Sequence, residues 1–255
     1  MTDRVVRASV RVPLERAEEA RALALELSPG GFEESDDDRK LTLSLYVDAS
    51  TVASIHEAFA DVQITPVEPG WEDAWRAFHR PARVGGLWIG PPWEEPGPGE
   101  RAVVIDPGRA FGTGAHPTTR ACIELLARSE RTPLLDIGCG SGVLAIAAAR
   151  LGFDPIRAVD NDPVAVETTI ANAAANRVSI HASLLDAEVD ALPVLATTVA
   201  NVLLAPIERI LSRLSSGVVI ASGYLDTDLP LAPGWRSTDR FTLDGWAADR
   251  FERDS

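Results

Sequence analysis

Hydrophobic residues recur along the chain with two different spacings, and their order predicts two kinds of domain. In the first 67 residues, the segments RVVRASVRV and LTLSLYV alternate like strands, whereas LERAEEARALALEL and STVASIHEAFA have helical periodicity. GFEES, before an acidic turn, and VQITPVE add two further strands. The resulting order β-α-β-β-α-β predicts a small ferredoxin-like α+β domain over residues 1–67.

A short aromatic helix follows this domain. Trp71, Trp75 and Phe78 have the i, i+4, i+7 spacing of one helix face. Large rings at helical spacing usually bury against a neighbour, so we interpret this face as a packing seam between domains. Residues 68–80 are therefore expected to form a helical linker.

From residue 133 to 223, strand-like segments alternate with helix-like ones. Such alternation is typical of a parallel sheet covered by helices on both faces. Beyond it, WRSTDRFTL and GWAADRFER predict two strands joined by Asp244-Gly245, a hairpin that places an antiparallel strand at or beside the sheet edge. We expect residues 81–255 to form an α/β domain with a doubly wound, mostly parallel sheet.

Composition narrows the class of protein. No apolar run approaches the roughly 18 residues of a membrane helix, and the first residues do not have the layout of a secretory signal, so we expect a cytoplasmic protein without a membrane partner. Cys122 and Cys139 have neither the number nor the spacing of a disulfide framework or a zinc site, which predicts buried thiols. The formal charge of -14 disfavours a broad contact with nucleic-acid phosphates. It is compatible with a basic partner, although such a charge often serves only solubility.

The strongest functional signal is a glycine turn in LLDIGCGSGVLAIAA, where a predicted strand continues directly into an apolar helix. Open α/β sheets bind ligands at the carboxyl ends of their strands. Gly138, Gly140 and Gly142 permit a sharp turn and a close approach of a ligand to the main chain. Asp160 ends the next strand, IRAVD, where a carboxylate can accept both hydroxyls of a ribose.

A dinucleotide-binding loop has similar geometry, but its GxGxxG pattern is not met. The third glycine comes one position early, at Gly142, and Val143 stands where the motif needs glycine. Asp136 beside the turn would repel a pyrophosphate, whereas S-adenosylmethionine carries a cationic sulfonium and an ammonium group. The turn thus predicts an S-adenosylmethionine-dependent methyltransferase; the alternative is a purely structural turn.

Two other segments supply candidate ligand contacts. DPGRAFGTGAHPTTR can cover the strand ends, and Thr118 and Thr119 begin the helix that follows, where hydroxyl and N–H groups are available to a carboxylate. In VANVLLAP, Asn201 offers an amide that can hold the methionine part of the cofactor or orient an amine, unless it only caps the next helix. His116, a lone loop histidine, is assigned no role.

Four segments together resemble the ribosomal protein L11 methyltransferase family, namely WEDAWRAFHRP, DPGRAFGTGAHPTTR, DIGCGSGVLAIAAARLG with VDNDP, and VANVL. The resemblance covers roughly residues 60–250, and FGTGxHPTT is its specific part. It implies an N-terminal domain that binds ribosomal protein L11 and a Rossmann-like domain that methylates lysine side chains and the N-terminal amine of L11. It also implies that the loop 111–114 closes over the site. The predicted cofactor contacts, with Gly140 added from the glycine turn, are Thr119, Gly138, Gly140, Asp160 and Asn201.

The chain departs from the family pattern at two points. VLATTVAN lacks the acidic residue expected ahead of Asn201, and Tyr224 stands where an aliphatic residue is more usual. These departures affect the details of the pocket more than the class of enzyme.

Methyl transfer to an amine mainly needs alignment of the reactants and exclusion of water. Burial disfavours the charged form of a lysine and so helps to deprotonate it. We therefore assign no catalytic residue and no metal, and expect the proton to go to solvent or a backbone carbonyl.

Two alternative functions remain open. One is methylation of lysines in a different basic protein, and the other is a non-catalytic, ribosome-associated module that binds S-adenosylmethionine. A methyltransferase acting on adenine N6 is disfavoured, because Val202-Leu203-Leu204 replaces the proline-proline-aromatic run of those enzymes. No sequence-specific nucleic-acid binding is expected.

Overall fold

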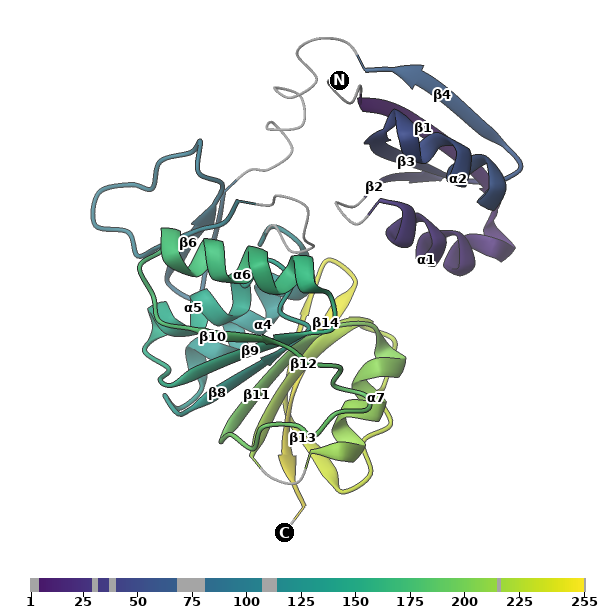
Figure 1. The fold of residues 1–255 in the computed structure, drawn as a ribbon. Coiled ribbons are helices and arrows are strands. Elements are labelled where there is room, and N and C mark those ends of the chain that lie inside the picture. The colour runs from purple at the N-terminus through teal and green to yellow at the C-terminus, as the bar shows by residue number, and fades with distance from the viewer. Residues whose placement is uncertain are drawn as a thin grey trace. The chain divides into compact units, whose positions relative to one another are not determined.

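The computed structural model divides the chain into two compact units, Met1–Phe78 and His79–Ser255 (Figure 1). Each unit has hydrophobic clusters of its own and is described separately. The predicted linker and its aromatic face lie outside the described part of the chain. The residues that the structure describes are 5–28, 32–36, 40–67, 81–106, 114–214 and 217–254.

The N-terminal unit is an antiparallel sheet with two helices, and its strands lie in the order β2-β3-β1-β4. Its elements in chain order are β1 (Val5–Pro13), α1 (Ala17–Leu27), β2 (Phe32–Asp36), β3 (Lys40–Asp48), α2 (Val52–Ala58) and β4 (Val62–Pro66). Short 3-10 turns, Leu14–Arg16 and Ala49–Thr51, precede the helices. Alternate positions of β1 and β3 are buried, as the period of two in their sequence predicts. The element order is the expected one, whereas the ferredoxin-like class of this unit stays a prediction.

The C-terminal unit is built on a seven-stranded sheet in the order β10-β9-β8-β11-β12-β14-β13. Its strands are β8 (Leu134–Ile137), β9 (Ile156–Asp160), β10 (His181–Leu184), β11 (Thr197–Asn201), β12 (Val218–Leu225), β13 (Trp235–Leu243) and β14 (Trp246–Arg253). The first five strands in the sheet order are parallel, while β14 is antiparallel to β12 and to β13. This confirms the doubly wound, mostly parallel α/β class. The chain reverses its direction of winding between β8 and β11, the position at which such sheets bind ligands.

Helices cover both faces of this sheet (Figure 1). They are α4 (Pro117–Arg128), α5 (Val143–Leu151), α6 (Pro163–Ala175) and α7 (Leu204–Arg213). On one face, α4 and α5 contribute Leu126 and Ile146 to a large apolar cluster. On the other face, α7 contributes Ile207 and Leu211 to a second cluster. The glycine turn before α5 is therefore held between the sheet and a buried helix.

A second, three-stranded sheet was not predicted from the sequence. It consists of β5 (Ala82–Val84), β6 (Leu87–Gly90) and β7 (Ala102–Val104), with β6 and β7 parallel. Strands of three or four residues are too short to show a period of two, which explains the omission. The Pro- and Gly-rich stretch between β6 and β7 forms the expected loop.

The hairpin predicted near the C-terminus is present. Asp244 and Gly245 have φ values of 50° and 81°, and they connect β13 and β14 at the pair Leu243 and Trp246. Two successive positive φ angles are typical of the tightest hairpin turns, which explains the Asp-Gly sequence. In the described part of the chain, no helix is both long and apolar enough to cross a membrane.

Candidate functional site

The carboxyl edge of the parallel sheet brings the predicted site residues together. Gly138 follows β8, Asp160 ends β9, and Asn201 ends β11. Thr119 lies in the first turn of α4 and joins them through a hydrogen bond from Asn201 Nδ2 to its Oγ1, 3.2 Å long. Segments far apart in the sequence thus meet at the reversal point of the sheet.

The turn after β8 depends on glycine in two ways. Gly138, Gly140 and Gly142 have φ values of 69°, 52° and 81°, a region that L residues with side chains rarely adopt. A Cβ atom on Gly138 would also lie 2.5 Å from Cγ1 of Val202. The turn therefore packs closely against the segment that follows Asn201.

Asp160 is bound to the glycine turn through its carboxylate. Its Oδ2 accepts the N–H of Gly140 at 2.9 Å, and its Oδ1 accepts the N–H of Asp162 at 3.0 Å. A carboxylate has about four acceptor positions, so both oxygens can still accept hydrogen bonds from ligand hydroxyls.

A second carboxylate, Asp136, lies buried at the base of the turn with only 1% of its surface exposed. Its Oδ2 accepts the N–H of Ala145 at 3.0 Å, while its buried Oδ1 has no hydrogen-bond partner among the residues that the structure describes. Burial raises the pKa of Asp136 from 3.8 to about 7; the bond from Ala145 opposes this rise, and the charge of Asp160 adds to it. Among the described residues, neither carboxylate forms a salt bridge. The turn is thus flanked by two acidic side chains, of which the carboxylate of Asp160 suits a cationic ligand better than an anionic one, while Asp136 carries its charge only above a pKa of about 7.

The start of α4 differs from the expectation in one respect. His116 is the N-cap of this helix: its Nδ1 accepts the N–H of Thr118 at 3.3 Å and lies 2.8 Å from the Thr118 Oγ1. The Thr118 N–H is therefore engaged by the protein, and the prediction that it is available to a ligand was wrong. Burial lowers the pKa of His116, which favours the neutral ring that this acceptor role requires. The position directly before Pro117, at the first residue of a helix, was the sequence signal for this cap.

Asn201 does not cap the next helix. The N-cap of α7 is Leu203, which makes no side-chain cap, and Asn201 instead points its amide nitrogen at Thr119. Its amide oxygen remains an acceptor at the strand end.

Of the proposed covering loop 111–114, only Gly114 is described. Its φ is 83°, and a Cβ atom there would lie 2.5 Å from Cγ2 of Ile89. The backbone at Gly114 therefore approaches β6 closely.

The two cysteines are buried, as predicted. Burial raises the pKa of Cys139 to about 12 and also raises that of Cys122. Both thiols therefore stay protonated at neutral pH, which makes them poor nucleophiles.

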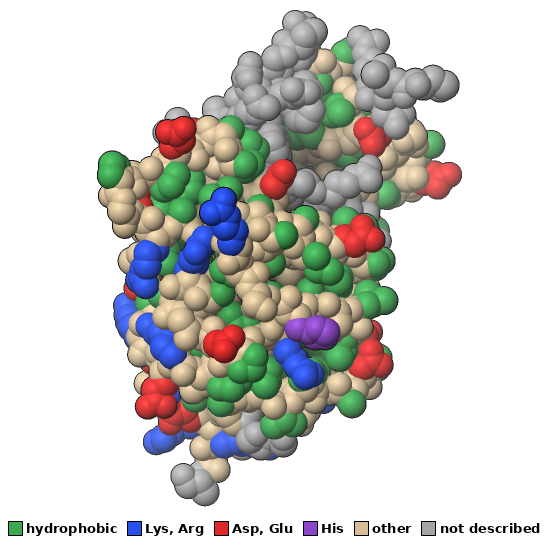
Figure 2. Space-filling view, turned by 60° about the vertical axis from the view of Figure 1, so that its left-hand side comes forward, with side chains coloured by type: hydrophobic (Ala, Val, Ile, Leu, Met, Phe, Trp, Pro, Cys, Tyr) green, Lys and Arg blue, Asp and Glu red, His purple; other side chains and the backbone are tan. Residues whose placement is uncertain are grey.

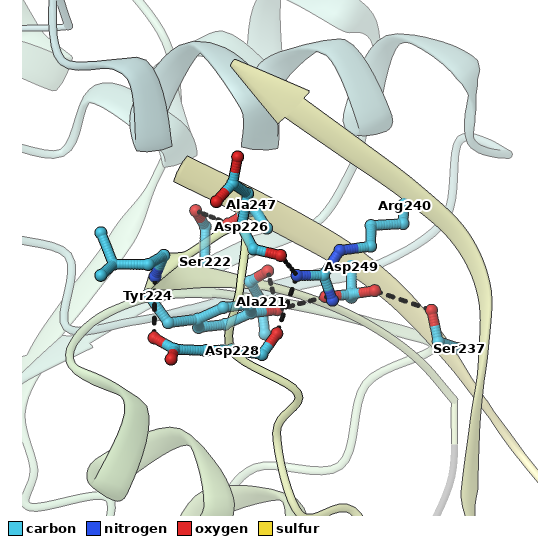
Figure 3. Close-up of polar contacts among 10 residues, drawn as sticks. Ala221, Ser222, Tyr224, Asp226, Asp228, Ser237, Arg240, Ala247 and Asp249 are labelled. Carbon is cyan, nitrogen blue, oxygen red and sulfur yellow. Dashed lines mark hydrogen bonds and ion pairs between the residues drawn. The ribbon is translucent and has the colours of Figure 1, made fainter. Parts of the chain in front are cut away.

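Tyr224, which departs from the family pattern, is explained by a buried polar network (Figure 3). Its hydroxyl lies 2.9 Å from Oδ2 of Asp249 and 3.0 Å from the carbonyl of Ala221. Asp249, only 1% exposed, also accepts hydrogen bonds from Ser237 at 2.8 Å and Arg240 at 3.0 Å. An aliphatic residue at position 224 would leave Asp249 with one donor fewer. Sequence reasoning missed this network, whose only signal was an acidic residue inside the apolar strand GWAADRFER.

Charges of both signs occur on the face of the molecule drawn in Figure 2. Lys and Arg side chains there are interspersed with acidic and apolar ones. This face therefore does not offer one extended area of a single charge.

The chain matches the family model of ribosomal protein L11 methyltransferase (PrmA) over residues 13–243. It is 37% identical over 224 residues to the ribosomal protein L11 methyltransferase of Aliivibrio salmonicida, which covers 84% of this chain and 74% of that protein. The corresponding protein of Herpetosiphon aurantiacus is 48% identical over 122 residues, 46% of this chain and 38% of that protein. The chain covers 38% to 55% of the length of the first curated relatives that it matches.

A solved structure is similar as well. The crystal structure of ribosomal protein L11 methylase from Lactobacillus delbrueckii subsp. bulgaricus has a TM-score of 0.63 and 28% sequence identity with this chain. The similarity covers 69% of this chain and 100% of the other.

Proposed function

Because the chain belongs to the ribosomal protein L11 methyltransferase family, we propose that it transfers methyl groups from S-adenosylmethionine to lysine side chains and the N-terminal amine of ribosomal protein L11. The observation that carries the proposal is the glycine turn flanked by Asp136 and Asp160, neither of which forms a salt bridge among the described residues. The Asp160 carboxylate at the strand end suits a cationic sulfonium or ammonium group and would repel a pyrophosphate, and Asp136 adds negative charge only above its pKa of about 7.

The residues at the sheet edge fit such a cofactor. Asp160 would accept the ribose hydroxyls while keeping its bond to Gly140, and Gly138 and Gly140 let the main chain approach the ligand. The paired side chains of Thr119 and Asn201 would hold the methionine part. When bound, the cofactor would supply a methyl group on a sulfonium sulfur, and the neutral thioether that departs from this methyl group is a good leaving group.

The chain's own contribution to the reaction is alignment. In the alternative to holding the methionine part, Asn201 Oδ1 would accept a hydrogen bond from an incoming neutral amine and so direct its lone pair. Asp136 is buried and bound to Ala145, and Asp160 is bound to Gly140, so we assign neither of them the role of base. The proton of the amine leaves to solvent or to a backbone carbonyl.

Several features favour an active enzyme over a non-catalytic module. The turn conformation, the Asp160 contact and the bond from Asn201 to Thr119 are all in place. We place the reaction in the cytoplasm and assign the recognition of L11 to the domain 1–67, with the linker 68–80 and the methyltransferase domain 81–255 following it.

The test is mass spectrometry of purified L11 incubated with S-adenosylmethionine and this protein, alongside Asp160→Ala. We expect mass gains in steps of one methyl group with the natural protein and none with the variant. Fragment masses would then show whether lysines and the N-terminal amine carry the groups. If L11 gains no mass although the protein binds the cofactor, the protein either methylates a different basic protein or is a non-catalytic module that binds S-adenosylmethionine. Absence of cofactor binding would overturn the assignment as a methyltransferase.

A further inference from the structure

We propose that Thr169 and Asn172 of α6 are positioning residues that hold the glycine turn in its ligand-binding conformation. We further infer that Asn172 joins this turn to Asp106, two residues beyond the end of β7. The inference rests on the proposed function only in taking the turn as the cofactor site. The two residues are three apart and therefore lie on the same face of the helix.

Thr169 holds the middle of the turn. It is fully buried, and its Oγ1 donates to the carbonyl of Gly140 at 3.0 Å, with Cys139 Sγ 3.3 Å away. Its side chain also packs on Gly142, where an added Cβ would come within 3.0 Å of it. In a trans peptide the carbonyl and the next N–H point in opposite directions, so this bond also sets the direction of the Ser141 N–H.

Asn172 holds the next peptide group of the turn. Its Nδ2 donates to the carbonyl of Ser141 at 2.9 Å and to the carbonyl of Asp106 at 3.2 Å. Its Oδ1 accepts the N–H of Asp106 at 3.1 Å. Both amide hydrogens and the amide oxygen of this 4% exposed side chain are therefore used. Only an asparagine amide in this orientation satisfies two carbonyls and one N–H at once.

Together with Asp160, these side chains form hydrogen bonds to backbone groups of the turn from two elements. Asp160 accepts the N–H of Gly140. The side chains of α6, which begins three residues after Asp160, donate to the carbonyls of Gly140 and Ser141. A turn with three glycines has many accessible conformations, and a ligand that must select one of them binds more weakly. Side chains that hold one conformation in advance therefore raise the affinity for the ligand.

Asn176, the C-cap residue directly after α6, provides a matched control. Its amide exchanges two hydrogen bonds with the backbone of Val104 in β7, from Nδ2 to the carbonyl at 2.5 Å and from the N–H to Oδ1 at 2.8 Å. It is 3% exposed, and its Nδ2 also donates to the backbone carbonyl of Asn172 at 2.9 Å. Among the described residues, its side chain makes no hydrogen bond to the glycine turn. Asn176→Ala thus loosens β7 by the same chemistry and leaves the turn intact.

The experiment measures binding of S-adenosylhomocysteine by calorimetry to the full chain and four variants. Loss of a buried hydrogen bond is expected to weaken binding about tenfold or more in Asn172→Ala and in Thr169→Val. Asn176→Ala should stay within about twofold of the natural protein, and Thr169→Ser, which keeps the hydroxyl, should recover most of the affinity. In steady-state assays of methyl transfer, Asn172→Ala and Thr169→Val should raise KM for S-adenosylmethionine more than they lower kcat.

Equal weakening in Asn172→Ala and Asn176→Ala would overturn the inference, as would unchanged binding in Thr169→Val. Thermal unfolding of each variant shows whether it is folded at the temperature of the titration. If the natural protein itself binds no S-adenosylhomocysteine, the proposed function fails instead.

Discussion

At the scale of single residues, the site is dominated by two carboxylates in different surroundings. Asp160 lies at a strand end with two N–H donors, whereas Asp136 is buried and one of its oxygens has no hydrogen-bond partner within the described part of the chain. Burying a charged carboxylate without an ion-pair partner costs free energy, so burial raises the pKa of Asp136 to about 7. The ionisation of Asp136 is therefore expected to make the stability of the fold depend on pH.

We predict that Asp136→Asn removes a pH dependence of stability. The pKa of Asp136 is about 7 in the folded state and near 3.8 in the unfolded state. The contribution of protonated Asp136 to the free energy of unfolding is therefore complete below about pH 4 and is lost as the pH rises to 7. The amide carries no charge and keeps an acceptor for Ala145. At pH 8 the variant should therefore be more stable than the natural protein by an amount on the order of a few kcal/mol, and at pH 4 the two should be similar.

Urea denaturation at pH 4, 6 and 8 measures this difference. Asp254→Asn, an exposed carboxyl outside the site, serves as the control and should follow the natural protein at every pH. A constant difference between Asp136→Asn and the natural protein across this range would contradict the assigned pKa.

At the scale of elements, the antiparallel hairpin β13-β14 is bound to β12 by side-chain hydrogen bonds as well as by backbone pairing. Gly223 lies at a bulge between β12 and β14, with φ of 115°, and an added Cβ would clash with the carbonyl oxygen of Val202. Beside this bulge, Tyr224 and Arg240 converge on Asp249 (Figure 3). The antiparallel edge of the sheet therefore depends on the buried side chain of Asp249, which accepts hydrogen bonds from three other side chains.

We predict that breaking this network destabilises the C-terminal unit in a graded way. Arg240→Ala leaves the buried Asp249 without its counter-charge and should lower the free energy of unfolding by about 3 kcal/mol. Tyr224→Phe removes one hydroxyl donor and should cost about 1 to 2 kcal/mol. Arg236→Ala, an exposed arginine on the same strand, is the control and should have little effect. Denaturation curves monitored by tryptophan fluorescence give these values; equal effects of Arg240→Ala and Arg236→Ala would show that the ion pair is unimportant.

At the scale of the whole molecule, the two units have separate cores. The N-terminal cluster includes Leu43 and Ile55, and the C-terminal clusters include Ile146 and Leu211. All five predicted cofactor contacts belong to the C-terminal unit. Cofactor binding and substrate recognition can therefore be tested separately.

We predict that residues 79–255 alone bind S-adenosylhomocysteine as tightly as the full chain but fail to methylate L11. The reason is that all five predicted cofactor contacts lie in this unit, whereas we assign recognition of L11 to the first unit. Calorimetry and mass spectrometry of both proteins, prepared in parallel, provide the measurements. Methylation of L11 by the shorter protein at the full rate would refute the role assigned to the first unit.

The local signals of the chain determined much of the central part of the fold. The strand 134–137, the glycine turn and the helix 143–151 follow directly from apolar patterning and from glycines that a tight turn requires. Asp244-Gly245 likewise determined a hairpin, because its positive φ angles match the twist of two paired strands. Gly138, Asp160 and Asn201 could be placed near one another because the ends of parallel strands share one edge of a sheet.

Contacts between distant segments were decided only by the tertiary structure. The three short strands β5, β6 and β7 have too few residues for a recognisable period, and β7 is held by amides some 70 residues away in α6. Asn172 looks in sequence like an ordinary helix residue, since nothing local indicates that it will meet both Ser141 and Asp106. The same holds for Tyr224 and Asp249, whose pairing requires two strands that become neighbours only when the sheet forms. Local patterning specifies elements and turns, whereas the partners of buried polar groups depend on how those elements pack.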